Sequence, residues 1–377
     1  MIVGYLMFDT IPTKYWHKLE DGRIQCDVCP RNCKLREGQR GLCFVRANLD
    51  NQIKLTTYGR SSGYCIDPIE KKPLNHFLPG SPVLSFGTAG CNLACKFCQN
   101  WDISKSRDID TLADTAMPED IAKAAQNMNC LSVAYTYNDP VIFMEYAIDV
   151  AKECHKLGIH SVAVSAGYIN PEPCKELYSF MDAANIDLKS FSEDFYYKIT
   201  GSHLQPVLDT LIYLKKETDV WFEITNLVIP EENDSDVEFE RMSEWIMTNL
   251  GPDVPLHFTA FHPDWKMMDK APTPFSTLQR AREIAIKTGL HYVYTGNVHD
   301  TTGSSTYCPH CKLPVIVRDW YRILDYRVDD TGHCLNCRMQ IAGVFKGAVG
   351  HWGPRRVMLC AGQFFKRQAP LIQSESN

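Results

Sequence analysis

The sequence has no long apolar run and no block of basic residues among its 377 positions. No uninterrupted apolar stretch approaches the ~20 residues that a membrane-spanning helix needs, so we expect no membrane span. Between Met1 and Glu20, the polar residues Asp9, Lys14 and His17 interrupt any apolar core, which argues against a secretory signal. The formal net charge of -6 argues against a surface for nucleic acids, and we expect a cytoplasmic protein.

Cysteine, by contrast, is abundant, because the chain has 16 cysteines and eleven of them fall in three tight clusters. In a reducing compartment, closely spaced cysteines indicate metal sites more than disulfides. The five isolated cysteines are expected to be small buried hydrophobic residues. They are Cys65, Cys130, Cys154, Cys174 and Cys360.

Short apolar runs alternate with amphipathic helical patterns through the middle of the chain. The predicted strands are residues 83–87, 131–137, 161–165, 184–188, 220–228, 256–261 and 291–294. The predicted helices are residues 118–129, 141–157, 173–181, 206–216, 236–249 and 278–287. This alternation predicts an α/β fold with a parallel sheet and right-handed crossovers. Six or so repeats predict a partial (β/α)6 barrel of the TIM type, with its chemistry at the carboxyl ends of the strands.

Composition divides the chain into three regions. Residues 1–82 are rich in loops and cysteines and end in a linker, residues 61–82, that is dense in glycine, serine and proline. Residues 83–300 carry the strand–helix alternation. Residues 301–377 begin with a polar linker, residues 301–306, and the tail after Arg367 has the composition of a frayed end. We therefore expect one large domain between two smaller cysteine-rich modules.

Three cysteines, Cys91, Cys95 and Cys98, follow the first predicted strand of the middle region. Thiolates at this spacing can converge on one metal centre. Four irons bound by three thiolates leave one iron open to a small molecule, which makes a cofactor reactive rather than structural. A zinc loop is the alternative, although a structural zinc site needs four ligands.

Polar side chains follow the other predicted strands: Asn138 and Asp139, then Ser165, then Asp187 and Lys189, then Asn226, and finally His262. Because side chains alternate along a strand, Asp187 and Lys189 lie on one face and both can point inward. Structural explanations are also open. Asp139 can cap the following helix, Asp187 and Lys189 can form a salt bridge at the rim, and His262 can be a structural histidine.

The run from Gly90 to Cys98 resembles the Cys-x3-Cys-x2-Cys signature of radical S-adenosylmethionine (SAM) enzymes, including an aromatic residue, Phe97, before the last cysteine. The resemblance implies a [4Fe–4S] cluster on Cys91, Cys95 and Cys98, with the amino and carboxylate groups of SAM on the fourth iron. One electron would break the sulfonium C–S bond. The resulting 5′-deoxyadenosyl radical would abstract hydrogen from a substrate.

Two later segments extend this resemblance. Asn138-Asp139-Pro140 resembles a degenerate form of the Gly-Glu-Pro segment that contacts the methionine amino group, although its acid is shorter and it has no glycine. Asp187-Leu188-Lys189 resembles the Asp-Leu-Lys of glycyl-radical-enzyme activases, which lies near the methionine end of the cofactor. The resemblance implies catalytic roles for Lys189 and for His262, at the substrate mouth. It implies cofactor contacts for Asn138, Asp139, Ser165, Asp187, Lys189 and Asn226.

A closer resemblance, to the AmmeMemoRadiSam system radical SAM enzyme family, spans about residues 26–337. Five segments carry it besides the cysteine loop: residues 67–74, 77–80, 135–137, 261–264 and 292–298. This family is related to pyruvate formate-lyase activating enzymes and is linked to partner proteins, one of them Memo-like. The resemblance implies such partners and an electron donor such as flavodoxin or ferredoxin. Residues 67–74 are either a solvated turn or a lid on the substrate side.

The two flanking cysteine sets predict further metal sites. Cys26, Cys29, Cys33 and Cys43 form a compact knuckle that either zinc or a second iron–sulfur cluster would satisfy. Cys308, Cys311, Cys334 and Cys337 form two Cys-x2-Cys knuckles with the spacing of a zinc ribbon, and residues 315–317 and 320–328 can supply its small sheet.

Two functions from different classes follow. The first is a radical SAM enzyme that acts on a protein or small-molecule substrate. The second is a zinc-binding adaptor, or a nucleic-acid-binding protein, without turnover. The open iron predicted at Cys91, Cys95 and Cys98 favours the first, and the negative net charge disfavours binding to nucleic acid.

Overall fold

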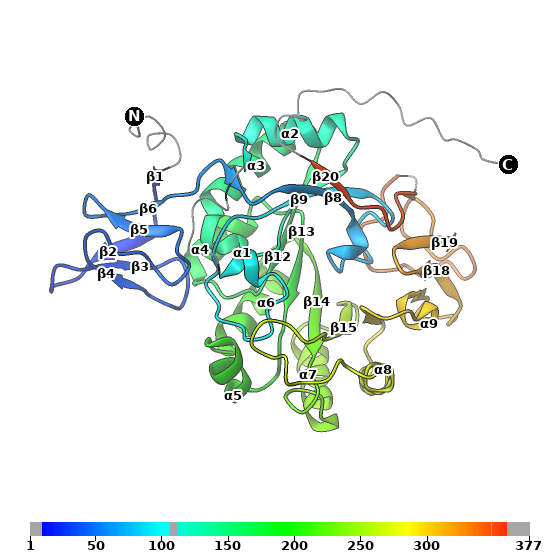
Figure 1. Ribbon diagram of the computed structural model, residues 1–377. Coiled ribbons are helices and arrows are strands. Elements are labelled where there is room, and N and C mark those ends of the chain that lie inside the picture. The colour runs from blue at the N-terminus through cyan, green and yellow to red at the C-terminus, as the bar shows by residue number, and fades with distance from the viewer. Residues whose placement is uncertain (1–9, 106–111, 113, 348, 360–377) are drawn as a thin grey trace.

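The computed structural model describes residues 10–105, 112, 114–347 and 349–359 (Figure 1). Cys360 and the tail predicted to fray lie outside the described residues. Within the described chain, no helix has the length and apolar character needed to cross a membrane.

A nine-stranded sheet forms the centre of the fold, in the order β16-β15-β14-β13-β12-β11-β9-β8-β20. Its parallel strands are β9 (Pro82–Phe86), β11 (Ser132–Tyr135), β12 (His160–Ser165), β13 (Ala183–Asp187), β14 (Trp221–Val228), β15 (Leu256–Ala260) and β16 (Val293–Gly296). The predicted α/β class and parallel sheet are confirmed. Among the described strands, β16 and β20 pair with one neighbour each, so the sheet is open.

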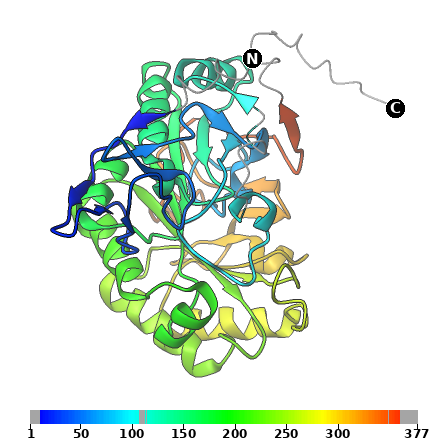
Figure 2. The same cartoon turned by 60° about the vertical axis from the view of Figure 1, so that its left-hand side comes forward.

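Amphipathic helices connect the parallel strands. They are α2 (Pro118–Asn127), α3 (Met144–Lys156), α4 (Pro171–Tyr178), α6 (Gln205–Glu217), α7 (Asp236–Asn249) and α8 (Phe275–Thr288), and Figure 2 shows them around the outer side of the sheet. Local capping interactions and backbone preferences determine where these helices begin and end. Pro118 occupies the first turn of α2, where it needs no backbone hydrogen bond, and Asp120 accepts from the Met117 amide. Gly289 ends α8 with a φ of 114°, which favours glycine.

The predicted linker 61–82 contains a strand of the large sheet. Strand β8 (Tyr64–Pro68) is buried at all five residues and pairs antiparallel with β9, and β20 (Val357–Leu359) pairs with β8. Asp67 is fully buried there because Lys71 and Lys72 donate to its carboxylate at 2.9 and 2.7 Å. Residues 67–74 are therefore not a solvated turn. The glycines and prolines of this segment are typical of a turn, but it contains a buried strand whose Asp67 forms ion pairs with Lys71 and Lys72, four and five residues along the chain.

The N-terminal region forms two small antiparallel sheets beside the large one. The first joins β1 (Ile11–Pro12), β6 (Gln52–Leu55) and β5 (Arg46–Leu49), and the second joins β2 (Trp16–Lys18), β3 (Ile24–Cys26) and β4 (Lys34–Leu35). Val45 and Leu55 belong to the same hydrophobic core as the strands of the large sheet. This region is therefore packed against the centre of the fold.

The C-terminal region carries the small sheet expected from its sequence. It consists of β17 (Thr306–Tyr307), β18 (Pro314–Asp319) and β19 (Arg322–Tyr326). Arg318 anchors this sheet to the rest of the protein, because its guanidinium donates to the Asn75 carbonyl at 2.6 Å. The short helix α9 (Thr301–Ser304) occupies the predicted polar linker.

One short strand pair and several short helical turns complete the elements. Strand β7 (Arg60–Ser61) pairs with β10 (Asp114–Thr115). Helix α1 (Trp101–Ser104) follows the central cysteines, and α5 (Glu193–Phe195) leads into a π-helical turn at Tyr196–Thr200. Short 3-10 turns lie at Ile69–Lys71 and Pro140–Phe143.

Candidate functional site

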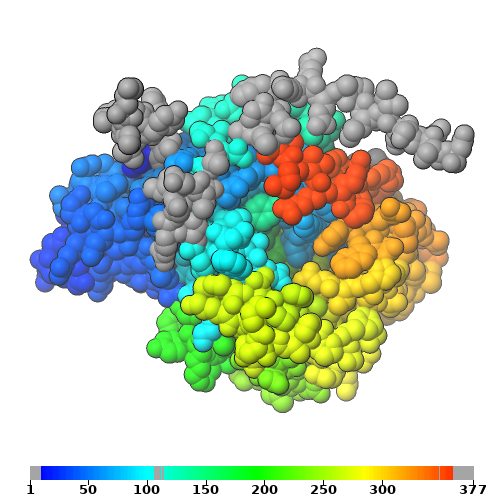
Figure 3. All heavy atoms as spheres, in the orientation of Figure 1, coloured from blue at the N-terminus to red at the C-terminus, as the bar shows by residue number. Residues whose placement is uncertain are grey.

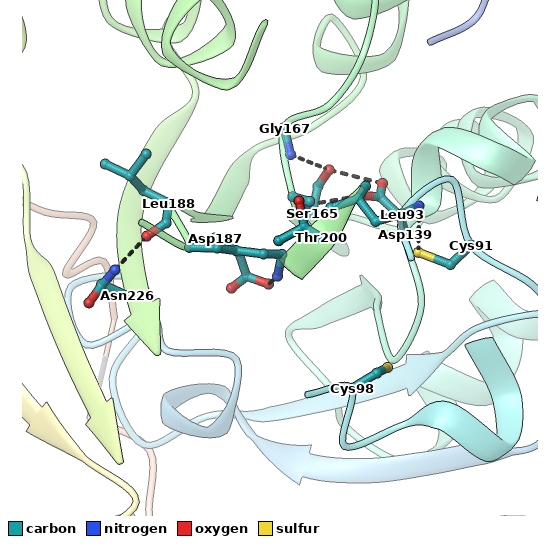
Figure 4. Close-up of polar contacts among 12 residues, drawn as sticks. Cys91, Leu93, Cys98, Asp139, Ser165, Gly167, Asp187, Leu188, Thr200 and Asn226 are labelled. Atoms are coloured by element: carbon teal, nitrogen blue, oxygen red, sulfur yellow. Dashed lines mark hydrogen bonds and ion pairs between the residues drawn. The ribbon is translucent and has the colours of Figure 1, made fainter. Parts of the chain in front are cut away.

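A cavity of about 260 Å³ opens at the carboxyl ends of the parallel strands. Eight of the residues singled out from the sequence line it: Cys91, Cys95, Cys98, Asn138, Asp139, Ser165, Asp187 and Lys189. Figure 4 shows several of these side chains around one space, although they come from β9, β11, β12 and β13 and the segments that follow. The structure thus brings together residues that lie as far as 98 positions apart in the sequence.

The cysteine loop is tied to its surroundings by backbone hydrogen bonds. The amides of Ala94 and Lys96 donate to the carbonyls of Thr200 and Ile199 at 2.8 and 3.0 Å. Near its end, the Cys98 sulfur lies 3.0 Å from the Ser104 hydroxyl in α1. These contacts define the path of the loop.

Asn138 connects the second parallel strand to the start of this loop. Its side-chain amide donates to the carbonyls of Thr88 and Gly90 at 2.8 and 2.9 Å. Its side-chain oxygen accepts from the Thr88 amide at 3.3 Å. Because these bonds occupy the side chain, Asn138 positions the residue that precedes Cys91.

Asp139 is a buried carboxylate on the cavity wall. It accepts from the amides of Val141 and Ala166 and from the Ser165 hydroxyl, at 3.0, 2.9 and 3.0 Å. The bond from Val141 is the helix cap expected from the sequence. Among the described residues, no lysine, arginine or histidine forms an ion pair with Asp139, and burial raises the pKa of its carboxyl group. A carboxylate has about four acceptor positions, so one more donor can bind here.

Asp187 and Lys189 form the expected pair, with the Lys189 ammonium 2.8 Å from an Asp187 oxygen. Burial alone would lower the pKa of Lys189, but attraction to Asp187 and the electrostatic interaction with Cys95 raise it above its ordinary value. The lysine is therefore a fixed positive charge beside the cysteine loop. Its partner Asp187 is 36% exposed and also lines the cavity.

Two predicted residues are not brought into the cavity. Asn226 is fully buried and donates to the Leu188 carbonyl at 2.8 Å, so it links β14 to the end of β13 (Figure 4). Its neighbours Thr225 and Leu227 line the cavity instead, because alternate side chains of β14 face opposite sides of the sheet. His262 is exposed, and its contact is the Pro263 carbonyl at 2.9 Å. Neither placement supports the roles predicted for Asn226 and His262.

Lys105 and Asn297 are among the cavity residues that the sequence did not single out. Lys105 donates to the Leu93 carbonyl at 2.8 Å and brings a second positive charge to the cysteine loop. Asn297 follows β16 and donates to the Ala260 carbonyl at 3.1 Å. Its position three residues after the predicted strand 291–294 was the available signal. Lys105 lay in a segment without periodicity and gave none.

Burial disfavours the ionised form of two of the central thiols, Cys91 and Cys95. Burial raises the pKa of Cys91 to about 12 and also raises that of Cys95. Metal binding must therefore release their protons, which couples occupancy of the site to pH.

The C-terminal cysteines form a compact four-thiol site. The sulfurs of Cys308, Cys311, Cys334 and Cys337 all lie within 4.8 Å of one another. Tetrahedral zinc with Zn–S bonds of about 2.3 Å places its sulfurs about 3.8 Å apart. The closest pairs, Cys308 with Cys337 and Cys311 with Cys334, are 3.5 and 3.8 Å apart. The site has the dimensions that one tetrahedral metal ion needs.

Comparison with known proteins identifies the superfamily. Residues 86–242, which include the cysteine loop, match the radical SAM superfamily. An uncharacterized protein of Methanocaldococcus jannaschii is 39% identical over 328 residues, which are 87% of this chain and 97% of that protein. The chain belongs to the radical SAM superfamily. Membership implies a [4Fe–4S] cluster and SAM as cofactors.

Relatives with described activities are more distant. The pyruvate formate-lyase-activating enzyme of Listeria monocytogenes is 26% identical over 171 residues, which are 42% of this chain and 67% of that enzyme. This radical SAM protein is therefore related to activating enzymes. A radical SAM methyltransferase structure from Sphaerobacter thermophilus aligns with a TM-score of 0.48 and 12% identity over 76% of each chain.

Proposed function

We propose that this chain is an activating-enzyme-like radical SAM enzyme that cleaves SAM reductively and starts radical chemistry on a protein or small-molecule substrate. The observation that supports it most is the convergence of three cysteines with Asp139, Asp187 and Lys189 on one cavity. When bound, the cluster and SAM supply a one-electron cleavage that gives methionine and a 5′-deoxyadenosyl radical, which takes hydrogen from the substrate.

The donor set fits a cluster better than a single ion. In the part of the chain that the structure describes, Cys91, Cys95 and Cys98 are not within 4.8 Å of one another, whereas the C-terminal thiols are. Thiolates that each bind a different iron must lie farther apart than thiolates on one zinc. Three cysteines line this cavity, so a fourth iron has no thiolate from the cavity wall.

The charged residues give the methionine end of SAM a binding surface. Asp139 has a free acceptor position and no cationic partner among the described residues, so it is suited to the SAM amino group. Lys189 and Lys105 bring positive charge that suits the carboxylate. Asp187 orients the Lys189 ammonium through their 2.8 Å contact. Ser165 positions Asp139 by donating to it.

The finer parts of the proposal rest on the sequence motifs. We place the chain in the AmmeMemoRadiSam system family, with Memo-like and related system partners and a flavodoxin or ferredoxin as electron donor. The four C-terminal thiols hold zinc in a ribbon, and the open parallel sheet is the partial (β/α)6 barrel. A cytoplasmic location suits these reduced thiols.

Anaerobic purification followed by electron paramagnetic resonance (EPR) tests this function. The wild-type protein should be brown, and SAM should change the EPR spectrum of the dithionite-reduced cluster, because SAM binds its open iron. Cys95→Ala should abolish the SAM-dependent change. Cys130→Ala, a buried cysteine outside the cavity, is the matched control and should keep it. A colourless protein that contains zinc alone would support the adaptor without turnover.

A further inference from the structure

Four thiols of the N-terminal region face one enclosed space. Cys26, Cys29, Cys33 and Cys43 line a second cavity of about 20 Å³, which exceeds the 10–15 Å³ that one water needs. Cys26 and Cys43 are buried, whereas Cys29 and Cys33 are partly exposed. The set therefore reaches from the surface into the core.

Their spacing differs from that of the C-terminal zinc-like site. In the described part of the chain, the four C-terminal sulfurs gather within 4.8 Å, and no three of the N-terminal sulfurs do so. One tetrahedral zinc would require all four sulfurs about 3.8 Å apart. An iron–sulfur cluster spreads its thiolates over two or more irons, which suits the wider set.

A buried arginine adds an independent observation. Arg46 lines the same cavity at 2% exposure, and it pairs with Glu145 through Nη1 and Nη2 at 2.9 and 2.5 Å. Its Nε has no hydrogen-bond partner among the described residues. A buried donor without a partner is costly, and a cluster offers sulfur acceptors and negative charge.

The second cavity adjoins the radical SAM loop. The Cys43 carbonyl lies so close to Gly90, the residue before Cys91, that a Cβ at Gly90 would be 1.9 Å from it. Arg31 lines the second cavity and donates through Nε to the Asn92 carbonyl at 2.8 Å. Asn92 itself lines this cavity, although it belongs to the central loop. Figure 3 shows the blue N-terminal region against the cyan segment that contains this loop.

We infer that Cys26, Cys29, Cys33 and Cys43 hold a second iron–sulfur cluster that passes electrons to the centre at Cys91, Cys95 and Cys98. A soluble donor of the flavodoxin or ferredoxin class gives one electron to the second cluster and is oxidised by one electron. The second cluster returns to its oxidised state when that electron moves to the central cluster. No proton moves and no covalent bond forms in either transfer. The destination of the electron rests on the proposed function, whereas the presence of the cluster does not.

Metal analysis of the full-length chain with Cys91→Ala, Cys95→Ala and Cys98→Ala tests the second cluster. This triple variant should keep the iron and sulfide of the second cluster, about a third to a half of the wild-type content, and its absorption near ~400 nm. Adding Cys29→Ser should remove the remaining iron. A triple variant with two zinc ions per chain and no iron would overturn the inference. This measurement needs no SAM. If the triple variant keeps its iron but the wild-type protein never cleaves SAM, the proposed function is rejected and the second cluster is still supported.

A donor comparison tests the electron transfer. Cys29→Ser, at a partly exposed ligand, should lower 5′-deoxyadenosine release driven by reduced flavodoxin at least ~10-fold. Release driven by dithionite, a small reductant that can reach the central cluster directly, should change less than ~2-fold. An equal loss with both reductants, with the central cluster still present by EPR, would overturn the transfer. If Cys29→Ser does not fold, Mössbauer spectra of the wild-type protein count its iron–sulfur clusters instead. Spectra that account for one cluster per chain would overturn the inference.

Discussion

The Lys189 ammonium lies 2.8 Å from an Asp187 carboxylate oxygen at the end of β13, inside the cavity that contains the central cysteines. The lysine is largely buried and the aspartate partly exposed, with side-chain exposures of 13% and 36%. A partly buried ion pair adds little to stability by itself. Its place beside three cysteines is the basis of the proposal that it binds the charged end of a ligand.

Lys189→Met should weaken SAM binding roughly 10- to 100-fold, because a charge-assisted hydrogen bond contributes about 1.5–3 kcal/mol. Equilibrium dialysis with the anaerobic protein measures the dissociation constant. Lys175→Met is the matched control, since Lys175 pairs with Glu172 at 2.7 Å on the surface. Equal SAM affinity in Lys189→Met and Lys175→Met would remove Lys189 from the site.

Asp139→Asn should also weaken SAM binding by about 10-fold or more, because it keeps the size of the side chain and removes the charge that would attract an ammonium. Calorimetry measures the affinity, and a thermal melt reports the cost of the altered bonds to Val141 and Ala166. Asp182→Asn is the control, because Asp182 accepts from the Ser161 amide away from the cavity. Unchanged affinity in Asp139→Asn would contradict the assigned contact.

Asp67→Asn should lower the free energy of unfolding by roughly 3–5 kcal/mol at pH 7, because it leaves the buried Lys72 ammonium without its partner. Burial opposes ionisation of Asp67, yet the two lysines lower its pKa to about 2. Its stabilising contribution is complete above its unfolded pKa near ~4 and is lost as the pH falls toward 2.

Urea titrations at several pH values check this dependence. The gap between wild type and Asp67→Asn should stay constant from about pH 7 to pH 5 and then narrow in acid. A gap that widens below pH 5 would show that the carboxylate is not the stabilising group.

Cys311→Ser should remove one zinc per chain and lower the thermal stability of the C-terminal sheet, because metal binding contributes folding free energy at thiolate sites. Metal analysis and a melting curve measure both effects. SAM cleavage should fall less than ~3-fold, since the four thiols lie outside the central cavity. Loss of iron instead of zinc would contradict the assignment of this site.

The sequence predicted most of the sheet because its strands are short apolar runs between amphipathic helices. Predicted residues 184–188 and 236–249 agree closely with β13 and α7. It did not predict β8, because Asp67 and the surrounding prolines are typical of a turn. The burial of Asp67 depends on Lys71 and Lys72, which one-dimensional patterns do not pair.

The sequence predicted those contacts of the site that join residues close together in the chain. Asp187 is the last residue of β13 and Lys189 follows two positions later, so the alternation of side chains at the end of the strand was enough to predict that they meet. The sequence analysis expected Asn226 at the cofactor site. Its neighbours Thr225 and Leu227 line the cavity instead, because side chains alternate along β14. The neighbourhood of Cys43 and Gly90 could not be predicted, because it depends on how the N-terminal sheets pack against the loop.

Release of 5′-deoxyadenosine from SAM by the anaerobic, dithionite-reduced protein tests the central claim most directly. The wild type and Cys130→Ala should release it, and the variant with Cys91, Cys95 and Cys98 changed to alanine should release none while keeping its N-terminal iron. Release by that triple variant at the wild-type rate, or no release by an iron-loaded wild type, would contradict the account.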